Sequence, residues 1–94
     1  MNKYTFTNVT IPAIDGGVLH QIIATSNFSN VTAGTVGGYI QGEHNLERIG
    51  NCWLTANASA QGNAHIKDSA WVTDNATLTS DATVFSSAMS NIVQ

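Results

Sequence analysis

The stretch from Gly50 to Asn91 repeats every six residues, and in register it reads GNCWLT, ANASAQ, GNAHIK, DSAWVT, DNATLT, SDATVF and SSAMSN. The third place of each hexad is Ala, with Cys52 as the one substitution, and the fifth place is aliphatic or Ala until Ser90. The first two places hold only Gly, Ala, Asp, Ser or Asn. Such a fixed short period decides the architecture before any other secondary-structure signal.

A period of six fits a short strand and a corner, and it does not fit a helix, whose apolar residues lie three or four apart. The third and fifth places are two residues apart, so their side chains point to the same side of a strand. The small polar pair before them predicts a corner, since Gly, Asn and Asp tolerate left-handed backbone angles. Residues eighteen apart should therefore pair as parallel neighbours, about 4.8 Å apart on one wall.

The hexads resemble the hexapeptide-repeat, left-handed parallel β-helix family, whose trimeric members include acyltransferases and γ-carbonic anhydrases. The resemblance implies an all-β fold in which three hexads make one triangular coil, and the left-handedness comes from the resemblance alone. It also implies a homotrimer. On this geometry the outward fourth place stacks Trp53, Trp71 and Met89 on one wall, which predicts an oligomer interface because soluble monomers seldom expose such an apolar stripe.

Before the repeat, an alternating segment at 3–7 and an apolar segment at 18–24 flank a Gly-rich turn and predict a β-hairpin that is not part of the coil. Residues 36–41 form an isolated hexad, and two extra residues within 42–49 predict a bulge or corner insertion there. The predicted organisation is a single domain over 1–94, with a hairpin cap over 1–35, coils over 36–91 and a tail over 92–94.

A second resemblance covers most of the chain, from about residue 18 to 84. The segments that carry it are Leu19-His20-Gln21-Ile22, Gly37-Gly38-Tyr39-Ile40 and Glu43-His44-Asn45-Leu46. They are similar to the opening module of small repeat proteins of bacteriophages and prophages. That resemblance implies a phage setting and no established chemistry.

The composition excludes several classes of partner. Charged residues are 10% of the chain, the net charge is −3, and three basic residues are too few to neutralise a nucleic-acid backbone. No apolar run has the length of a membrane span, and the first residues lack a signal-peptide core, which predicts the cytosol of the host bacterium. Cys52 is the only cysteine and stands at an inward place, which predicts a buried structural thiol.

The histidines are the main candidates for chemistry. His20, His44 and His65 are too widely spaced for a recognisable zinc pair, and no carboxylate is obviously placed to orient an imidazole ring. His65 as a general base would make the chain a reduced carbonic-anhydrase or acyltransferase relative, but two to three coils are too few to build an acyl-carrier cleft. The sequence thus predicts no catalytic residue, metal or cofactor.

These observations favour a non-catalytic trimer that binds or sequesters a host component, such as a host-defence protein or a small ligand. The residues expected to face a partner are His44, His65, Lys67, Thr83 and Phe85. A structural module of a phage particle or tail is the first alternative, and the reduced enzyme is the second.

The predicted interface has a direct test. Replacing Trp71 by Ala removes an aromatic side chain of the kind that anchors protein interfaces, so the assembly should shift to a lower molecular mass in solution. Light scattering measures that mass. A variant with the wild-type mass would contradict the interface assignment.

Overall fold

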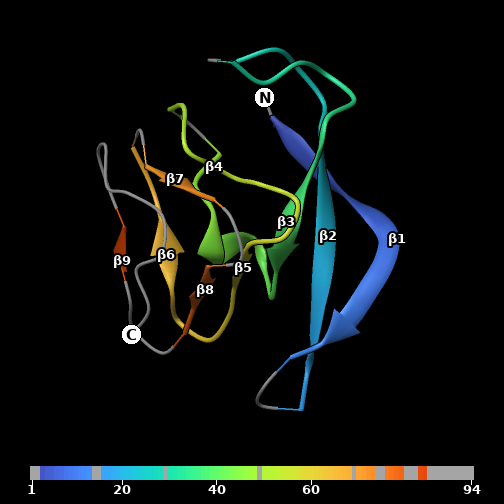
Figure 1. Cartoon of the computed structure of the whole chain (residues 1–94), viewed down its shortest axis with the longest axis vertical. Coiled ribbons are helices and arrows are strands. Elements are labelled where there is room, and N and C mark those ends of the chain that lie inside the picture. Colours follow the sequence, from blue (N-terminus) through green and yellow to red (C-terminus); the bar gives the residue numbers. More distant parts are fainter. Residues whose placement is uncertain are drawn as a thin grey trace.

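A computed structural model describes residues 3–13, 16–28, 30–48, 50–68, 70–73, 76–79 and 83–84, and it is almost entirely β-structure (Figure 1). The three longer strands are β1 (Tyr4–Pro12), β2 (Val18–Ala24) and β3 (Val36–Ile40), and a short 3-10 helix η1 (Glu43–Asn45) follows. Six two-residue strands come next: β4 (Trp53–Leu54), β5 (Ser59–Ala60), β6 (His65–Ile66), β7 (Trp71–Val72), β8 (Thr77–Leu78) and β9 (Thr83–Val84). None of the described residues lies in a helix long and apolar enough to cross a membrane.

The two-residue strands pair in parallel with the strand eighteen residues further along. Trp53 pairs with Trp71, Ser59 with Thr77, and the β6–β9 pair joins His65 to Thr83. Backbone hydrogen bonds run between these strands, for example from the Trp53 N–H to the Ala70 carbonyl at 3.1 Å. The predicted all-β class is confirmed, and the eighteen-residue pairing follows the hexad register.

The core contains the places that the pattern assigns to the interior. The third-place residues whose burial the structure describes are at most 4% exposed, and these are Cys52, Ala58, Ala64, Ala70 and Ala76. The fifth-place residues described in the same way are at most 2% exposed, and these are Leu54, Ala60, Ile66, Val72 and Leu78. Each hexad therefore buries one small and one larger side chain, as residues two apart on a strand must.

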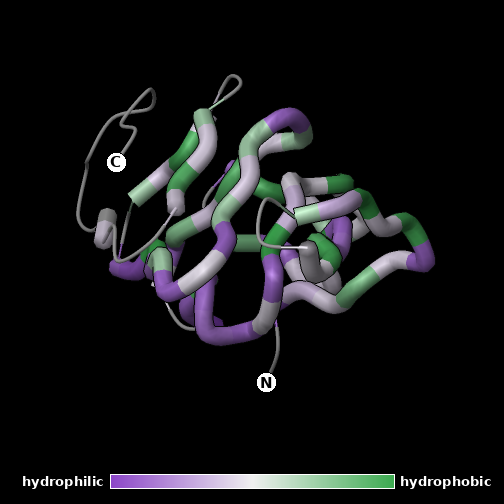
Figure 2. The backbone as a smooth tube through the Cα atoms, turned by 90° about the horizontal axis from the view of Figure 1, so that it is seen from below, coloured by the Kyte–Doolittle hydropathy of each residue, from purple (hydrophilic) through white to green (hydrophobic). Residues whose placement is uncertain are grey.

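The corners between strands are tight turns. The N–H of Ala58 donates to the Thr55 carbonyl at 2.9 Å, and the same three-residue spacing recurs at the next three corners. Gly50, Gly62 and Asp68, which occupy the first hexad place, adopt positive φ values of 79°, 65° and 59°. This backbone conformation explains the preference for Gly and Asp at that place. Several of the bends are also among the most hydrophilic parts of the tube in Figure 2.

The N-terminal hairpin continues one wall of the short strands. β1 pairs with β2 and β2 with β3, both antiparallel, and β3 then pairs in parallel with β5, which gives a five-stranded sheet in the order β1-β2-β3-β5-β8 (Figure 1). The close approach of β3 to the short strands requires two glycines. A Cβ on Gly38 would lie 2.3 Å from the Ala58 carbonyl oxygen, and one on Gly37 would lie 2.6 Å from the Trp53 ring.

The register locates the two extra residues of the 42–49 region more closely. Tyr39 pairs with Ser59 and Leu46 with Ile66, both twenty residues apart, whereas later pairs are eighteen apart. The additional length therefore lies after Leu46 and before Trp53. We call residues 46–52 the insertion segment.

Trp53 is covered by its own chain, although its place in the hexad points outward. It is 1% exposed, and the Phe28 ring packs edge-on against it at 5.4 Å between centroids. Trp53 is therefore buried within its own chain and does not form part of an exposed apolar stripe. Trp71 is half-buried and donates its Nε1–H to the Asn51 carbonyl at 2.8 Å, and Met89 lies outside the described residues. The oligomer interface itself stays a prediction.

Two buried side chains at the start of β1 tie the hairpin to the insertion segment. The Tyr4 hydroxyl donates to the Leu46 carbonyl at 2.8 Å, and Lys3 Nζ donates to the carbonyls of Gly50 at 3.2 Å and Cys52 at 2.7 Å. The Lys3 ammonium also lies 4.8 Å from the centroid of the Phe28 ring. Burial raises the pKa of Tyr4 to about 12, so the hydroxyl remains a donor even at pH 10.0, where an unperturbed phenol is half ionised.

The glycine at position 38 gives a test of the β3 junction. Gly38→Ala should lower the free energy of unfolding by about 1–3 kcal/mol, because the added methyl group meets backbone oxygens that cannot move aside. Urea denaturation measures the change, and Thr35→Ala, at an exposed position just before β3, is the matched control. An unchanged midpoint for Gly38→Ala would contradict the close packing.

The raised pKa of Tyr4 predicts a loss of stability in alkali. The unfolded chain ionises this phenol near its ordinary pKa of 10.0 and the folded chain at about 12, so the contribution is complete below pH 10 and disappears as the pH rises through 12. The loss should reach about 2–3 kcal/mol of unfolding free energy. Urea unfolding measured across this range should show a shallower decline for Tyr4→Phe than for the wild type, and parallel declines would rule out the assignment.

Candidate functional site

The residues predicted to face a partner divide between two parts of the structure. His65 lies on β6 and is half-buried, its pairing neighbour Thr83 is exposed, and Lys67 follows β6 in a half-buried position. His44 lies on η1 and is exposed. Phe85 lies outside the described residues. Both histidines are nevertheless close in the fold to residues 43–47. His44 is part of η1, and His65 contacts Glu47 just after it.

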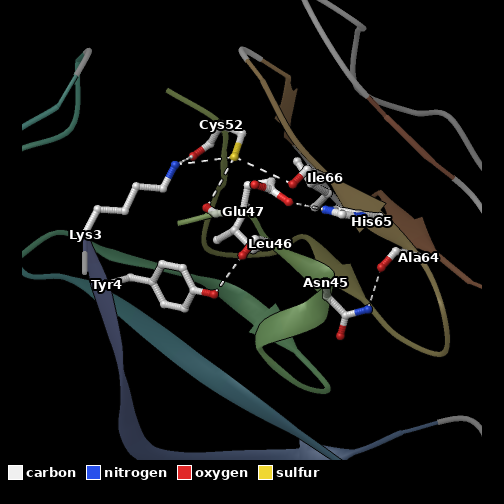
Figure 3. Close-up of polar contacts among 9 residues, drawn as sticks. All are labelled: Lys3, Tyr4, Asn45, Leu46, Glu47, Cys52, Ala64, His65 and Ile66. Atoms are coloured by element: carbon white, nitrogen blue, oxygen red, sulfur yellow. Dashed lines mark hydrogen bonds and ion pairs between the residues drawn. The ribbon is translucent and has the colours of Figure 1, made fainter. Parts of the chain in front are cut away.

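A carboxylate that the sequence did not single out lies against His65. Glu47 Oε2 is 2.8 Å from His65 Nε2, and the two side chains are 34% and 37% exposed (Figure 3). The expectation that no carboxylate orients a histidine ring was therefore wrong. Leu46, the residue before Glu47, pairs with Ile66, the residue after His65, which puts Glu47 and His65 on the same wall, and the Glu47 N–H donates to the Ile66 carbonyl at 2.9 Å.

A hollow of about 380 Å³ opens beside this pair. It is lined by residues of η1 and the insertion segment, namely Glu43, His44, Leu46, Glu47 and Arg48. Glu47 is common to the hollow and to the pair with His65. The hollow therefore adjoins the one histidine of the described chain that has a carboxylate partner.

Arg48 also lines the hollow. Its guanidinium makes an ion pair with Glu43 and lies 5.1 Å from the centre of the Tyr4 ring. Its Nη1 atom is buried and has no hydrogen-bond partner among the described residues. The lining of the hollow thus includes two carboxylates, one guanidinium and one imidazole.

Asn45 fixes the backbone that carries these residues. Its side chain is fully buried, accepts N–H donors from Gln41 and Gly42 at 2.9 and 3.0 Å, and donates to the Ala64 carbonyl at 2.6 Å. His44 Nε2 lies 2.8 Å from the Gly62 carbonyl. Asn45 therefore holds η1 against the backbone just before β6. This is a structural role in which both the oxygen and the NH₂ group of the amide form hydrogen bonds.

Cys52 does not offer a nucleophile to this site. It is fully buried, and burial raises the pKa of its thiol, although the nearby Lys3 ammonium at 3.3 Å acts in the opposite direction. A buried thiol with a raised pKa is a weak nucleophile. The predicted structural thiol fits this placement.

The chemistry that the site can perform is proton transfer. With Nε2–H donated to the Glu47 carboxylate, His65 Nδ1 has the lone pair of a general base. The carboxylate also stabilises the imidazolium that forms when the ring takes up a proton. Within the described part of the chain, no group of three His, Cys, Asp or Glu side chains gathers to hold a metal ion.

No protein-family model matches the sequence. A curated relative does match in part: the chain is 54% identical over 37 residues to the uncharacterized acetyltransferase YdcK of Escherichia coli (strain K12). The matched segment covers 39% of this chain, and it spans 11% of the relative's length. The partial match and the all-β structure together fit a β-helix-like acetyltransferase family.

This match corrects the functional expectation. A non-catalytic protein was predicted because the histidines had no visible partner and the coils were few, but the similarity to an acetyltransferase points toward an enzyme. Neither the match nor the structure tests the phage setting, the host partner or the trimer, which stay predictions.

Proposed function

We propose that this chain supplies an acyl-transfer site in which His65 is the general base and Glu47 orients it. The observation that carries the proposal is the 2.8 Å contact between the two side chains at the edge of the hollow. The similarity to an acetyltransferase gives the reaction class, with an acetyl thioester as donor and an amine or hydroxyl as acceptor. The exposed fraction of His65, about a third of its side chain, leaves the ring within reach of an acceptor.

The proposed step requires one base and no covalent intermediate on the protein. His65 Nδ1 takes the proton of the acceptor N–H or O–H as the acceptor attacks the carbonyl carbon of the thioester. The C–S bond then breaks, and the departing thiolate takes the proton back from the imidazolium. Glu47 lowers the barrier by holding the ring in one tautomer and by stabilising its positive charge.

The proposal also includes the course of the coil and the assembly of several chains. We infer that the parallel strands separated by eighteen residues continue as a left-handed β-helix and that three chains assemble side by side. The stacked pairs of β4–β7, β5–β8 and β6–β9 support the coil, and the half-buried Trp71 supports a contact between chains. In such a trimer a neighbouring chain would close the open side of the hollow, which is the usual location of small-ligand sites at interfaces.

A thiol-release assay tests the proposal. Purified wild-type chain is incubated with acetyl-CoA and a panel of simple alcohols, amines and amino sugars, and thiol formation is followed with a chromogenic disulfide. Release should depend on the acceptor. His65→Ala should then lower kcat/KM by about 10²- to 10⁴-fold, because the step loses its general base, and Glu47→Gln by about 10- to 100-fold, because the ring loses its partner.

A matched histidine control separates catalysis from general damage. His20 lies in the hairpin, stacked on Phe6 at 4.7 Å between ring centroids and away from the hollow, so His20→Gln should retain wild-type activity. If no acceptor in the panel supports thiol release, or if His65→Ala is as active as the wild type, the proposed function is wrong.

A further inference from the structure

The Glu47 carboxylate lies in the one part of the coil whose length departs from the repeat. The insertion segment contains the two residues that change the pairing distance from twenty to eighteen. Hydrogen bonds of the parallel strands hold the segment near its ends, where the Glu47 N–H donates to Ile66 and the Asn51 N–H donates to Asp68. The regular pattern of the hexads therefore does not by itself determine how Glu47 is presented to His65.

Additional support for the insertion segment comes from the start of the sequence. Tyr4 donates to the carbonyl of Leu46, the residue immediately before Glu47, in a buried bond of 2.8 Å across 42 positions of sequence. Figure 3 shows Lys3 and Tyr4 reaching from the start of β1 toward the segment, with His65 on its far side. Tyr4 thus fixes the entry of the segment.

Lys3 fixes the exit of the same segment. Its Nζ donates to the carbonyls of Gly50 and Cys52 and to the Cys52 sulfur, and the side chain is 5% exposed. The Cys52 sulfur in turn lies 3.5 Å from the Glu47 carbonyl, which it contacts as a weak donor. A continuous set of polar contacts therefore leads from the Lys3 ammonium to the backbone of Glu47.

We propose that Lys3 and Tyr4 are positioning residues, which act through the insertion segment to hold the Glu47 carboxylate against His65. Neither Lys3 nor Tyr4 lines the hollow, and both act on the placement of the Glu47 carboxylate through the insertion segment. The relevance of this device to catalysis rests on the proposed function. The placement itself can be observed without any substrate.

The test reads the tautomer of the His65 ring. In ¹⁵N-histidine-labelled protein, long-range ¹H–¹⁵N spectra distinguish a ring protonated at Nε2 from a mixture of tautomers, and His65→Gln assigns the signal. The wild type should show His65 with the proton on Nε2, at a pH where the ring is neutral. Glu47→Gln is the reference in which the carboxylate is absent.

Tyr4→Phe and Lys3→Met should each shift the His65 signal from the wild-type position toward that of Glu47→Gln. In each variant the insertion segment loses the hydrogen bonds of one of the two side chains that hold it. Thr5→Ala, at an exposed position of the same strand, is the matched control and should leave the signal unchanged. The backbone amide spectrum shows whether each variant is folded. Tyr4→Phe keeps the ring that contacts Arg48, so it decides the question if Lys3→Met does not fold.

Wild-type His65 signals in folded Tyr4→Phe would overturn the inference. This outcome is separate from failure of the proposed function, which is measured as acceptor-dependent thiol release by the wild type. If the wild type is active, Tyr4→Phe should also lower kcat toward the value of Glu47→Gln with little change in KM, because the acceptor's own contacts are kept.

Discussion

Each six-residue unit of this protein has two inward side chains that are two positions apart. A single unit cannot shield either side chain from water, so a neighbouring unit must cover both. A third-place Ala allows the backbone to turn closely around the interior, and a fifth-place aliphatic residue contributes about 1.5–3 kcal/mol when it is fully buried. The neighbour that covers this pair is the unit eighteen residues along, as in the Leu54–Val72 and Ala60–Leu78 pairs. Pairing of the short parallel strands therefore also brings their inward side chains together in the core.

The interior and the strands could be predicted from sequence because their signals are local. The third- and fifth-place residues from Cys52 to Leu78 are buried as the register requires. β2 has the bounds expected from its apolar run, and β3 (Val36–Ile40) lies within the isolated hexad at 36–41. The first strand was expected over 3–7, but β1 extends to Pro12. The alternation of polar and apolar residues resumes with Val9 and Ile11, and pairing of this second half with β2 extends the strand to Pro12.

The site could not be predicted in the same way, because it depends on contacts between distant segments. Glu47 lies on the wall of His65, but the two extra residues in this region made its register ambiguous until the pairing was known. Trp53 was assigned outward by the hexad and is buried with its ring against Phe28, which precedes it by twenty-five residues and belongs to the predicted cap over 1–35. A charged residue in the core, Lys3, has no sequence signature at all, since its partners are backbone carbonyls and a sulfur atom.

The two adjacent glycines of β3 have a consequence for how such a chain can vary in length. They allow β3 to pack closely against the short strands, so the antiparallel strands β1–β3 join the parallel strands β5 and β8 in one sheet. The N-terminal region belongs to this sheet although its sequence lacks the six-residue period. Genetic duplication or deletion of eighteen residues further along would add or remove one complete layer, while the junction at β3 and the histidine–glutamate contact would keep their geometry. Proteins of very different size could therefore inherit this same starting block.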